Sequence, residues 1–339
     1  MNEINITQTS RRVLVTGGGG FLGKAIVQML VDRGDRVTSF SRHRHKSLDR
    51  LGVAQINGDI GDAEAVEKAC RNMASVFHVA AKPGVWGSYE SFYQTNTIGT
   101  KNIINGCRKN NVPILVYTSS PSVIFNGSDM KGVNENVPYP VAWHAHYPET
   151  KAMAEQAVRN ASGNHLNTII LRPHLIWGPE DNHLVPRILK SAKKLVQVGN
   201  GTNRVDTIYV ENAACAHILA EEALRKNPSL SGNIYFISDD APIPLWEMVN
   251  NILKAGGCNP VKRRMSQRTA WFIGAVLEWI YRIFPINGEP RMTRFVAQEL
   301  ATSHWFDISA AKRDLGYAPI VSIQEGLEKL ERWLLKNLK

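Results

Sequence analysis

Short runs of apolar, β-branched residues alternate along the first half of the chain with segments of helical periodicity. Each run has the length of a strand and is bounded by turn-forming residues; the runs occupy residues 12–17, 36–40, 76–81, 114–120 and 167–173. Between them, apolar positions recur at helical spacing, as in residues 21–33, 63–71 and 96–109. Continuous apolar strands that alternate with helices are typical of a parallel sheet covered on both faces. The pattern therefore predicts a doubly wound α/β fold of the Rossmann type.

The alternation loosens after Pro173, where two kinds of segment share the second half of the chain. Residues 205–224 and 233–238 have the pattern of a strand, a helix and a further strand that return to the sheet. We therefore expect the chain to pass twice between two domains. The expected Rossmann domain comprises residues 11–176 and 205–238, and the smaller substrate-binding domain comprises residues 177–204 and 239–339.

Length and composition favour a globular protein of a reducing compartment. With 339 residues, of which 43% are hydrophobic, the chain can bury a large core. The polar N-terminus lacks the apolar segment of a signal peptide, so we expect a cytoplasmic protein. The cysteines have neither metal-ligand nor disulfide-framework spacing, and we interpret them as buried or idle thiols; they are Cys70, Cys107, Cys215 and Cys258. No metal site is expected.

The formal net charge of +10 favours anionic ligands. Nucleic acid and anionic membranes attract basic proteins, but the lysines and arginines are spread along the chain without a recognisable nucleic-acid-binding module. We therefore expect no nucleic-acid partner, and a basic surface that suits ligands bearing phosphate or carboxylate groups.

A glycine-rich turn follows the first predicted strand. Gly17, Gly20 and Gly23 lie between that strand and the next helix, within the sequence TGGGGFLG of residues 16–23. Gly17 permits the tight turn, Gly20 the close approach of phosphates, and Gly23 the packing of helix on strand. The same triplet also occurs in purely structural turns. Here the strand before it and the helix after it favour a site for a dinucleotide pyrophosphate.

The end of the second strand bears on which dinucleotide is bound. NAD-binding enzymes carry an acidic residue about 20 residues beyond the glycine turn, where this chain has Ser41 and Arg42. A hydroxyl and a guanidinium suit a 2′-phosphate, so the sequence favours NADP(H) over NAD(H). The alternative is that residues 42–46 form a solvated basic loop. Asp59, after the third strand, is a candidate for the adenine edge and equally an ordinary turn residue.

Tyr147 and Lys151 form a candidate catalytic pair. They are four residues apart and share one face of a predicted helix, although such a spacing also arises by chance. Ser120 closes the strand ILVYTSS at the sheet edge where ligands of such folds bind. A phenol that acts near neutral pH needs its pKa lowered by about 3, for which Lys151 and a positive nicotinamide are the expected sources. Tyr147 would then exchange a proton with a substrate oxygen that Ser120 hydrogen-bonds.

These motifs resemble those of the extended short-chain dehydrogenases/reductases. The TGxxGFxG turn is matched by residues 16–23, the YxxxK pair by Tyr147 and Lys151, and the family serine by Ser120. The resemblance covers nearly the whole chain and implies an NAD(P)-dependent oxidoreductase and a homodimer paired through residues 96–109 and 150–161. Beyond the residues already named, it implies cofactor contacts from Phe21, Leu22, Ile60, Ala80, Ala81, Lys82, Thr118 and Pro173.

Within that family the chain is most similar to the 3β-hydroxysteroid dehydrogenase branch. Residues 116–127 and 171–187 resemble both sterol-4-carboxylate 3-dehydrogenases (decarboxylating) and bacterial 2-alkyl-3-oxoalkanoate reductases of olefin biosynthesis. The reductases share something close to the sequence of residues 81–100. Both groups handle a 3-oxo or 3-hydroxy group β to a carboxylate on a hydrophobic body. Sterol enzymes commonly carry an acid where this chain has Ser41 and Arg42, which favours the NADPH-using reductase.

Three other functions are weighed against this one. A sterol or 3β-hydroxysteroid 3-dehydrogenase is the nearest alternative. A nucleotide-sugar epimerase or reductase shares the fold, but an apolar stretch at residues 270–284 is a poor lining for a sugar diphosphate. A non-catalytic NADP(H)-binding regulator has no need of Ser120, Tyr147 and Lys151 together.

The stretch at residues 270–284 is apolar almost all round and is interrupted by Glu278 and Arg282. It is too short to span a bilayer, which needs about 20 apolar residues. Our first interpretation is a buried helix of the substrate-binding domain. The second is an interfacial helix that contacts a membrane or a lipid-bearing partner enzyme, because basic residues precede it.

Overall fold

A seven-stranded parallel sheet organises the structure, a computed structural model that describes residues 10–163, 165–284, 286 and 288–337. Neighbouring strands pair in parallel throughout this sheet. Successive strands of the chain are added first towards one edge of the sheet and then, from the centre, towards the other. The order is β12 (Ile234–Ile237), β7 (Asn167–Pro173), β5 (Ile114–Thr118), β4 (Ser75–His78), β1 (Arg12–Thr16), β2 (Arg36–Ser41) and β3 (Ala54–Asn57). The predicted doubly wound fold is confirmed.

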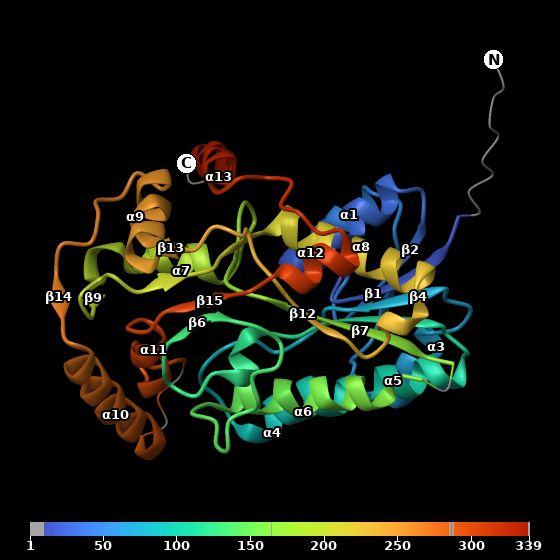
Figure 1. Cartoon of the computed structure of the whole chain (residues 1–339), viewed down its shortest axis with the longest axis horizontal. Coiled ribbons are helices and arrows are strands. Elements are labelled where there is room, and N and C mark those ends of the chain that lie inside the picture. The colour runs from blue at the N-terminus through green and yellow to red at the C-terminus, as the bar shows by residue number, and fades with distance from the viewer. Residues whose placement is uncertain (1–9, 164, 285, 287, 338–339) are drawn as a thin grey trace.

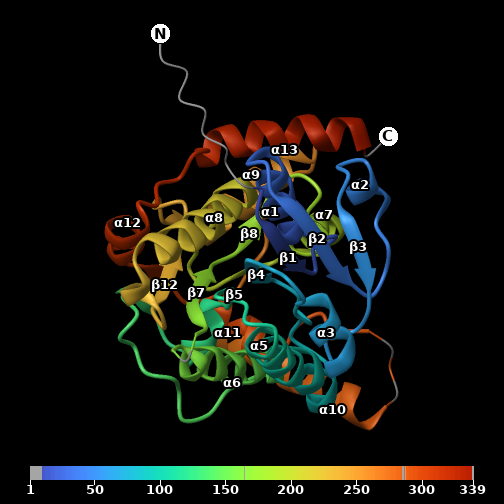
Figure 2. The ribbon, with the colours of Figure 1, turned by 90° about the vertical axis from the view of Figure 1, so that its right-hand side faces the viewer.

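Helices cover both faces of the sheet (Figures 1 and 2). One layer contains α1 (Phe21–Asp32), α8 (Val210–Lys226) and α12 (Ser309–Leu315). The other contains α3 (Ala63–Ala69), α4 (Tyr89–Phe92), the π-helix η1 (Tyr93–Ile98), α5 (Gly99–Lys109) and α6 (His146–Ala161). Side chains of one strand enter alternate cores, since Val13 and Val15 pack with the first layer and Leu14 packs with the second. This two-sided burial explains why the strands are apolar at successive positions.

Two of the apolar runs leave the sheet before they end. The run at residues 76–81 is a strand only as far as His78, and the run at residues 114–120 only as far as Thr118. Beyond His78, the backbone N–H groups of Val79 and Ala80 donate to the Thr16 hydroxyl, each at 3.1 Å, instead of to a neighbouring strand. The last residues of both runs therefore form loops at the carboxyl edge of the sheet.

The expected return of residues 205–238 to the sheet is half wrong. β12 joins the main sheet beside β7, as expected. The strand predicted before α8 does not: β10 (Arg204–Val205) and β11 (Ile208–Tyr209) are separate two-residue strands in smaller sheets. Asp206 lies between them, buried, and its carboxylate accepts a hydrogen bond from the Phe306 N–H at 2.8 Å. The backbone N–H of Asp206 donates to the His304 carbonyl oxygen at 2.7 Å, so this segment pairs with β15 rather than with the main sheet.

A second group of elements lies at the left of Figure 1 and shares a separate hydrophobic cluster that includes Trp177, Ile252 and Leu330. Its helices are α7 (Leu184–Ser191), α9 (Leu245–Ala255) and α13 (Ile323–Asn337). Three small sheets lie beside it. Together with β10 and β11, they are formed by β6 (Met130–Val133), β8 (Ile176–Trp177), β9 (Gln197–Val198), β13 (Ile243–Pro244), β14 (Arg264–Met265) and β15 (His304–Phe306). The remaining helices are α2 (Lys46–Asp49), α10 (Gln267–Ile283) and α11 (Arg294–Glu299), with single 3₁₀ turns at η2 (Pro121–Ile124), η3 (Ala192–Lys194) and η4 (Pro228–Leu230).

The first interpretation of residues 270–284, a buried helix, is wrong. They lie in α10, at the lower left of Figure 1, and only the side of α10 that carries Ala270, Gly274 and Glu278 is buried. Apolar periodicity indicates that a helix forms, but it does not say which side packs when almost every position is apolar. No helix among the described residues is both long and apolar enough to cross a bilayer.

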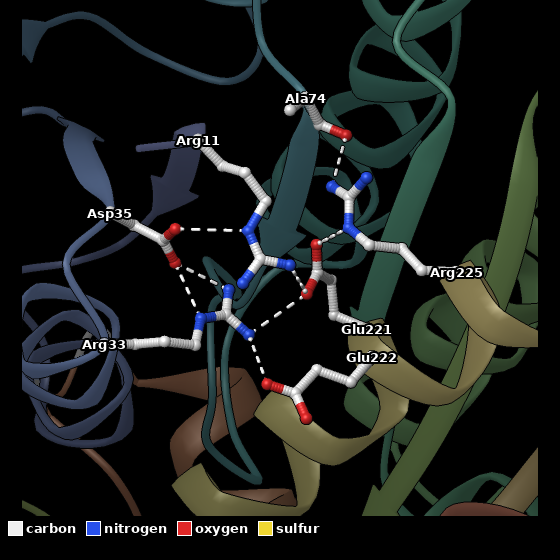
Figure 3. A network of polar contacts seen from close by, with 7 residues as sticks. All are labelled: Arg11, Arg33, Asp35, Ala74, Glu221, Glu222 and Arg225. Carbon is white, nitrogen blue, oxygen red and sulfur yellow. Dashed lines mark hydrogen bonds and ion pairs between the residues drawn. The ribbon is translucent and has the colours of Figure 1, made fainter. Parts of the chain in front are cut away.

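A network of ion pairs joins α8 to the amino edge of the sheet (Figure 3). Glu221, whose side chain is fully buried, lies 3.5 Å from Arg11, 3.1 Å from Arg33 and 2.6 Å from Arg225. Asp35 pairs in turn with Arg11 at 3.3 Å and with Arg33 at 2.6 Å. Each buried carboxylate is thus compensated by more than one guanidinium, which offsets the cost of its burial.

Candidate active site

Every residue predicted to bind the cofactor or to act in catalysis lies at or near the carboxyl edge of the main sheet. They end or follow six of its strands, or begin the helices that come next: Gly17, Gly20, Phe21, Leu22 and Gly23 after β1; Ser41 and Arg42 at the end of β2; Asp59 and Ile60 after β3; Ala80, Ala81 and Lys82 after β4; Thr118 and Ser120 at the end of β5; Tyr147 and Lys151 on α6; and Pro173 at the end of β7. In such sheets ligands bind at this edge, where the strand order reverses.

The glycine turn has the geometry of a pyrophosphate cradle. Gly17 has a φ of +69°, and a Cβ at this position would lie 3.0 Å from the Ala80 Cα. A Cβ on Gly23 would lie 2.1 Å from the Gly17 carbonyl oxygen, so helix and strand meet there without room for a side chain. The N-cap of α1 is Gly20, which supplies no side-chain cap, and the first turn holds no acidic residue. The N-terminus of α1 therefore suits an anionic ligand.

The basic loop after β2 is partly committed to the protein itself. The Ser41 hydroxyl donates to the His43 carbonyl oxygen at 2.8 Å, and Arg44 pairs with Asp49 at 2.9 Å. Arg42 is exposed and has no acidic partner among the residues that the structure describes. The loop folds back over the glycine turn, since a Cβ on Gly19 would lie 2.0 Å from the His45 ring. Unlike Arg44, Arg42 therefore offers an exposed guanidinium near the glycine turn. This guanidinium could receive a 2′-phosphate.

Two other predicted cofactor residues have partners in the protein. The Asp59 carboxylate accepts a hydrogen bond from the Gly61 N–H at 2.8 Å, which is the turn role recognised as its alternative. The Lys82 ammonium donates to the Ser91 hydroxyl and lies 5.0 Å from the centre of the Phe92 ring. The Lys82 backbone N–H donates to the Asn96 side chain at 2.8 Å. Each side chain therefore has a partner within the protein, although Asp59 is also exposed to solvent.

Lys151 is a buried ammonium without a carboxylate of its own. Its side chain is 2% exposed, and its Nζ donates to the Thr118 carbonyl oxygen at 2.7 Å and lies 4.3 Å from the centre of the Tyr117 ring. Burial lowers the pKa of Lys151 to about 7, and the negative charge of Glu155 counteracts this only in part. Half of the Lys151 side chains would therefore be neutral near physiological pH.

The protein alone does not lower the pKa of Tyr147, contrary to the expectation. Burial raises the pKa of Tyr147 to about 12; a hydrogen bond with Ser120 lowers it, and the negative charge of Glu299 raises it. Lys151, the expected source of a fall, has its Nζ on the Thr118 carbonyl oxygen instead. Any further fall must come from a bound cation, for which the nicotinamide ring remains the expected source.

The structure distinguishes between the two serines that end β5. The Ser119 hydroxyl donates to Glu155 at 2.5 Å, and both groups are buried. The Ser120 hydroxyl, half-buried, hydrogen-bonds the Ser122 hydroxyl at 2.9 Å and lies near enough to the Tyr147 phenol to lower its pKa. Ser120, Tyr147 and Lys151 are thus brought together at the carboxyl edge, with Ser120 and not Ser119 beside the phenol.

Two acidic side chains at this edge were not found from the sequence. Glu155 lies one turn after Lys151 and is held by Arg172 at 2.5 Å and by the Tyr139 hydroxyl at 2.7 Å. Its i,i+4 spacing from Lys151 was the available signal. Glu299, at the end of α11, is far away in the chain, and nothing in its local sequence marks it. Burial raises the pKa of Glu299 to about 7.

This arrangement can exchange a proton with a ligand oxygen. Tyr147 offers a phenol, Ser120 a second hydroxyl beside it, and Lys151 a proton-bearing group whose pKa lies near neutrality. A carbonyl or alcohol oxygen between the two hydroxyls would be hydrogen-bonded by both. The glycine turn and α1 lie along the same edge, ready for a dinucleotide.

Sequence comparison places the chain among known families. Residues 14–266 match the 3-beta hydroxysteroid dehydrogenase/isomerase family. The 2-alkyl-3-oxoalkanoate reductase of Stenotrophomonas maltophilia is 47% identical over 94% of this chain and 98% of that protein. The sterol-4-alpha-carboxylate 3-dehydrogenase, decarboxylating, of Mus musculus is 34% identical over 96% of this chain and 91% of that protein.

Solved structures share the fold. The UDP-glucuronic acid 4-epimerase of Bacillus cereus, solved in complex with NAD, superposes with a TM-score of 0.74 at 20% identity. The superposition covers 97% of this chain and 100% of that one. At this identity the likeness extends to the architecture and leaves the ligand to be argued from the site.

Proposed function

Because the chain belongs to the 3-beta hydroxysteroid dehydrogenase/isomerase family of the extended short-chain dehydrogenases/reductases, we propose that it reduces 2-alkyl-3-oxoalkanoates with NADPH. It is an oxidoreductase that acts on CH–OH groups and the corresponding carbonyls. The observation that carries the proposal is the grouping of Ser120, Tyr147 and Lys151 at the carboxyl edge, in a chain that matches a named reductase almost from end to end.

The residues present fit a nicotinamide dinucleotide. The uncapped N-terminus of α1 would hold the pyrophosphate, and the missing side chains at Gly17 and Gly23 let the helix pack closely on the turn and on the strand. Arg42 would pair with a 2′-phosphate, and the absence of a carboxylate from the end of β2 removes the group that would repel it. These features support NADP(H) over NAD(H).

The chain's own residues manage the proton. When bound, the nicotinamide supplies the hydride. Tyr147 gives its phenolic proton to the substrate oxygen, while Ser120 hydrogen-bonds the same oxygen and holds it in line. Lys151, whose pKa burial lowers to about 7, can restore a proton towards Tyr147 at neutral pH. Oxidation of an alcohol follows the same path in reverse.

A substrate with an apolar body and an acidic head is supported by several observations. The relative at 47% identity is named for such a substrate, and the protein carries a formal net charge of +10. A sterol-4-carboxylate, the substrate class in the name of the relative at 34% identity, has the same two parts and is the second candidate. The homodimer implied by the family resemblance stays a prediction.

A series of 3-oxo acids of increasing chain length, each compared with its neutral ester, tests the substrate. Burying one methylene contributes about 0.8 kcal/mol, so four more carbons should raise kcat/KM by up to roughly a hundredfold before ordering costs. Loss of the carboxylate should lower kcat/KM. A kcat/KM that is indifferent to both changes, together with turnover of sugar nucleotides, would remove the lipid-acid assignment.

The cofactor is tested separately. We expect kcat/KM to be higher with NADPH than with NADH, and Arg42→Ala to lower the value for NADPH while leaving that for NADH almost unchanged. Arg44→Ala is the matched control, because Arg44 lies two residues away and is already paired with Asp49. A wild-type preference for NADH, or equal effects of the two substitutions, would contradict the assignment.

A further inference from the structure

The distribution of side chains around α10 is the reverse of that on an ordinary surface helix, which buries its large apolar residues. Its buried side carries small residues and its one acid, namely Ala270, Gly274 and Glu278. A Cβ on Gly274 would lie 2.6 Å from the Thr293 backbone, so α10 rests directly on the residues that start α11. Glu278 accepts hydrogen bonds from the backbone and the side chain of Arg294, at 2.7 and 2.8 Å. The polar group of the helix thus faces inward and is satisfied there.

The outer side of α10 and the turn after it expose large apolar side chains. Of the eleven large hydrophobic residues that are exposed among the described residues, eight lie between positions 271 and 286. Phe272 is 65% exposed and Trp279 is 62% exposed, and they lie two turns apart along the helix. We call this set the α10 face; it comprises Trp271, Phe272, Ile273, Val276, Trp279, Ile283, Phe284 and Ile286. So dense a patch is unusual on a protein that meets only water.

The charges around the α10 face are almost all positive. Both acids of residues 262–294 are paired: Glu278 with Arg294 at 2.8 Å, and Glu289 with Arg187 at 3.4 Å. Within residues 262–294, the exposed charged side chains that have no ion pair among the described residues are all basic, namely Lys262, Arg263, Arg264, Arg268, Arg282 and Arg291. An apolar face bordered by cations matches a surface that is apolar within and anionic at its boundary.

We propose that the α10 face docks the protein on an anionic lipid bilayer. α10 has 17 residues and would lie in the plane of the headgroups, with its aromatic side chains towards the acyl chains. A second copy of the chain fits this face less well. A twofold contact would bring the same basic border against itself with no free acid to meet it.

The segment that carries the α10 face also contacts the loop that follows β4. Tyr281 on α10 packs edge-to-face on Trp86, with ring centres 6.1 Å apart, and the Glu289 carboxylate lies against Gly84. Trp86 and Gly84 belong to the loop that follows β4 and the predicted cofactor residues. Docking would therefore bring the site next to the bilayer. The idea that an apolar substrate is taken from the bilayer rests on the proposed function, whereas the docking itself does not.

Sedimentation of the full chain with vesicles tests the proposal. We expect binding to vesicles of phosphatidylcholine mixed with phosphatidylglycerol, weaker binding to phosphatidylcholine alone, and a decrease with added NaCl. The double substitution F272S/W279S should lower the partition coefficient by roughly tenfold or more, since both side chains are taken from water on docking. R264Q/R268Q should remove most of the preference for phosphatidylglycerol.

The control is I320S/L335S, which removes two apolar side chains of similar exposure, 56% and 63%, that lie outside the α10 face. It should bind vesicles as the wild type does. Circular dichroism and turnover of a short, water-soluble 3-oxo acid check the fold of each variant. No binding of the wild type to either vesicle, or equal losses in the control, would overturn docking. So would a wild-type dimer that F272S/W279S converts to monomers, because the face would then be a protein interface. Failure of the chain to reduce 3-oxo acids would overturn the proposed function and leave the vesicle result standing.

Discussion

The two edges of the main sheet bury charge in different ways. At the amino edge, Glu221 is fully buried and three arginines surround it, so the charge is compensated by charge (Figure 3). At the carboxyl edge, Lys151 is 2% exposed and is met by a carbonyl oxygen and an aromatic ring. A compensated charge keeps its protonation state over a wide pH range, whereas a charge met by neutral groups is displaced towards neutral pH.

The carboxylate of Glu155 lies close enough in the chain to have compensated the charge of Lys151. It lies on the same helix as Lys151, but its oxygens are taken by Arg172, Ser119 and Tyr139. Its charge therefore raises the pKa of Lys151 without forming an ion pair with it. The ion pairs of the amino edge should contribute mainly to stability, and the groups of the carboxyl edge mainly to proton exchange. Substitutions at the amino edge should therefore lower the free energy of unfolding, whereas those at the carboxyl edge should lower kcat.

Tyr147→Phe should have the largest effect on turnover and almost none on folding. It removes the transferable proton and leaves the ring, so kcat should fall by about 10²- to 10⁴-fold while NADPH still binds. Steady-state kinetics, cofactor titration and the thermal midpoint measure the three quantities. Tyr235→Phe is the matched control. Tyr235 lies on β12, at the edge of the sheet, and its hydroxyl donates to Asp314 at 3.1 Å. A comparable loss of kcat in the control would contradict the role of Tyr147 as the proton donor.

Glu221→Gln should have the opposite signature. Breaking a buried ion pair by removing one partner costs about 3–5 kcal/mol, so the urea midpoint should fall strongly while kcat of the folded enzyme is retained. Glu222→Gln serves as control: that side chain is 34% exposed and, among the described residues, forms an ion pair with Arg33 alone, so its loss should cost at most about 1 kcal/mol. If both variants unfold at the same urea concentration, the compensated network does not stabilise the amino edge.

Lys151→Met should change how stability depends on pH. The pKa of Lys151 is lowered to about 7 by burial, against an ordinary value of 10.5. Between these values the unfolded chain binds more protons, so the contribution of Lys151 to the free energy of unfolding rises with pH. The stability advantage of Lys151→Met should thus be largest at pH 7 and below, and shrink towards pH 10. Urea midpoints at several pH values measure it. Lys109→Met, at an exposed lysine, should give a constant difference between pH 7 and 9; a constant difference for Lys151→Met as well would refute the lowered pKa.

Glu299→Gln should have the smallest effect. Burial, more than any charge, raises the pKa of Tyr147, but Glu299 adds to it. Removing that charge should move the acidic limb of the pH–rate profile for alcohol oxidation, along which Tyr147 loses its proton, to lower pH by a fraction of a unit, with kcat on the plateau kept. An unmoved profile would place Glu299 outside the electrostatic reach of the phenol.

The parts of this molecule that follow local rules were predictable from the sequence. The strands, the glycine turn and the spacing of Tyr147 from Lys151 depend on residues close together in the chain. What depended on distant partners was not. The strand predicted before α8 pairs with β15 instead of the main sheet, and Lys151 donates to a carbonyl while Arg172 holds Glu155. The side on which α10 packs is likewise set by the backbone at Thr293.

The contact between Gly19 and His45 couples two positions in evolution. The His45 ring occupies the space that a side chain at position 19 would need, at 2.0 Å from the place of its Cβ. The His45 backbone is fixed as well, because its N–H donates to the Gln55 side chain at 2.8 Å. A mutation that adds even a methyl group at 19 therefore requires the partly exposed His45 ring to turn away or to be replaced by a smaller side chain. Among descendants of this sequence, the two sites should covary, with larger residues at 19 found more often beside smaller residues at 45.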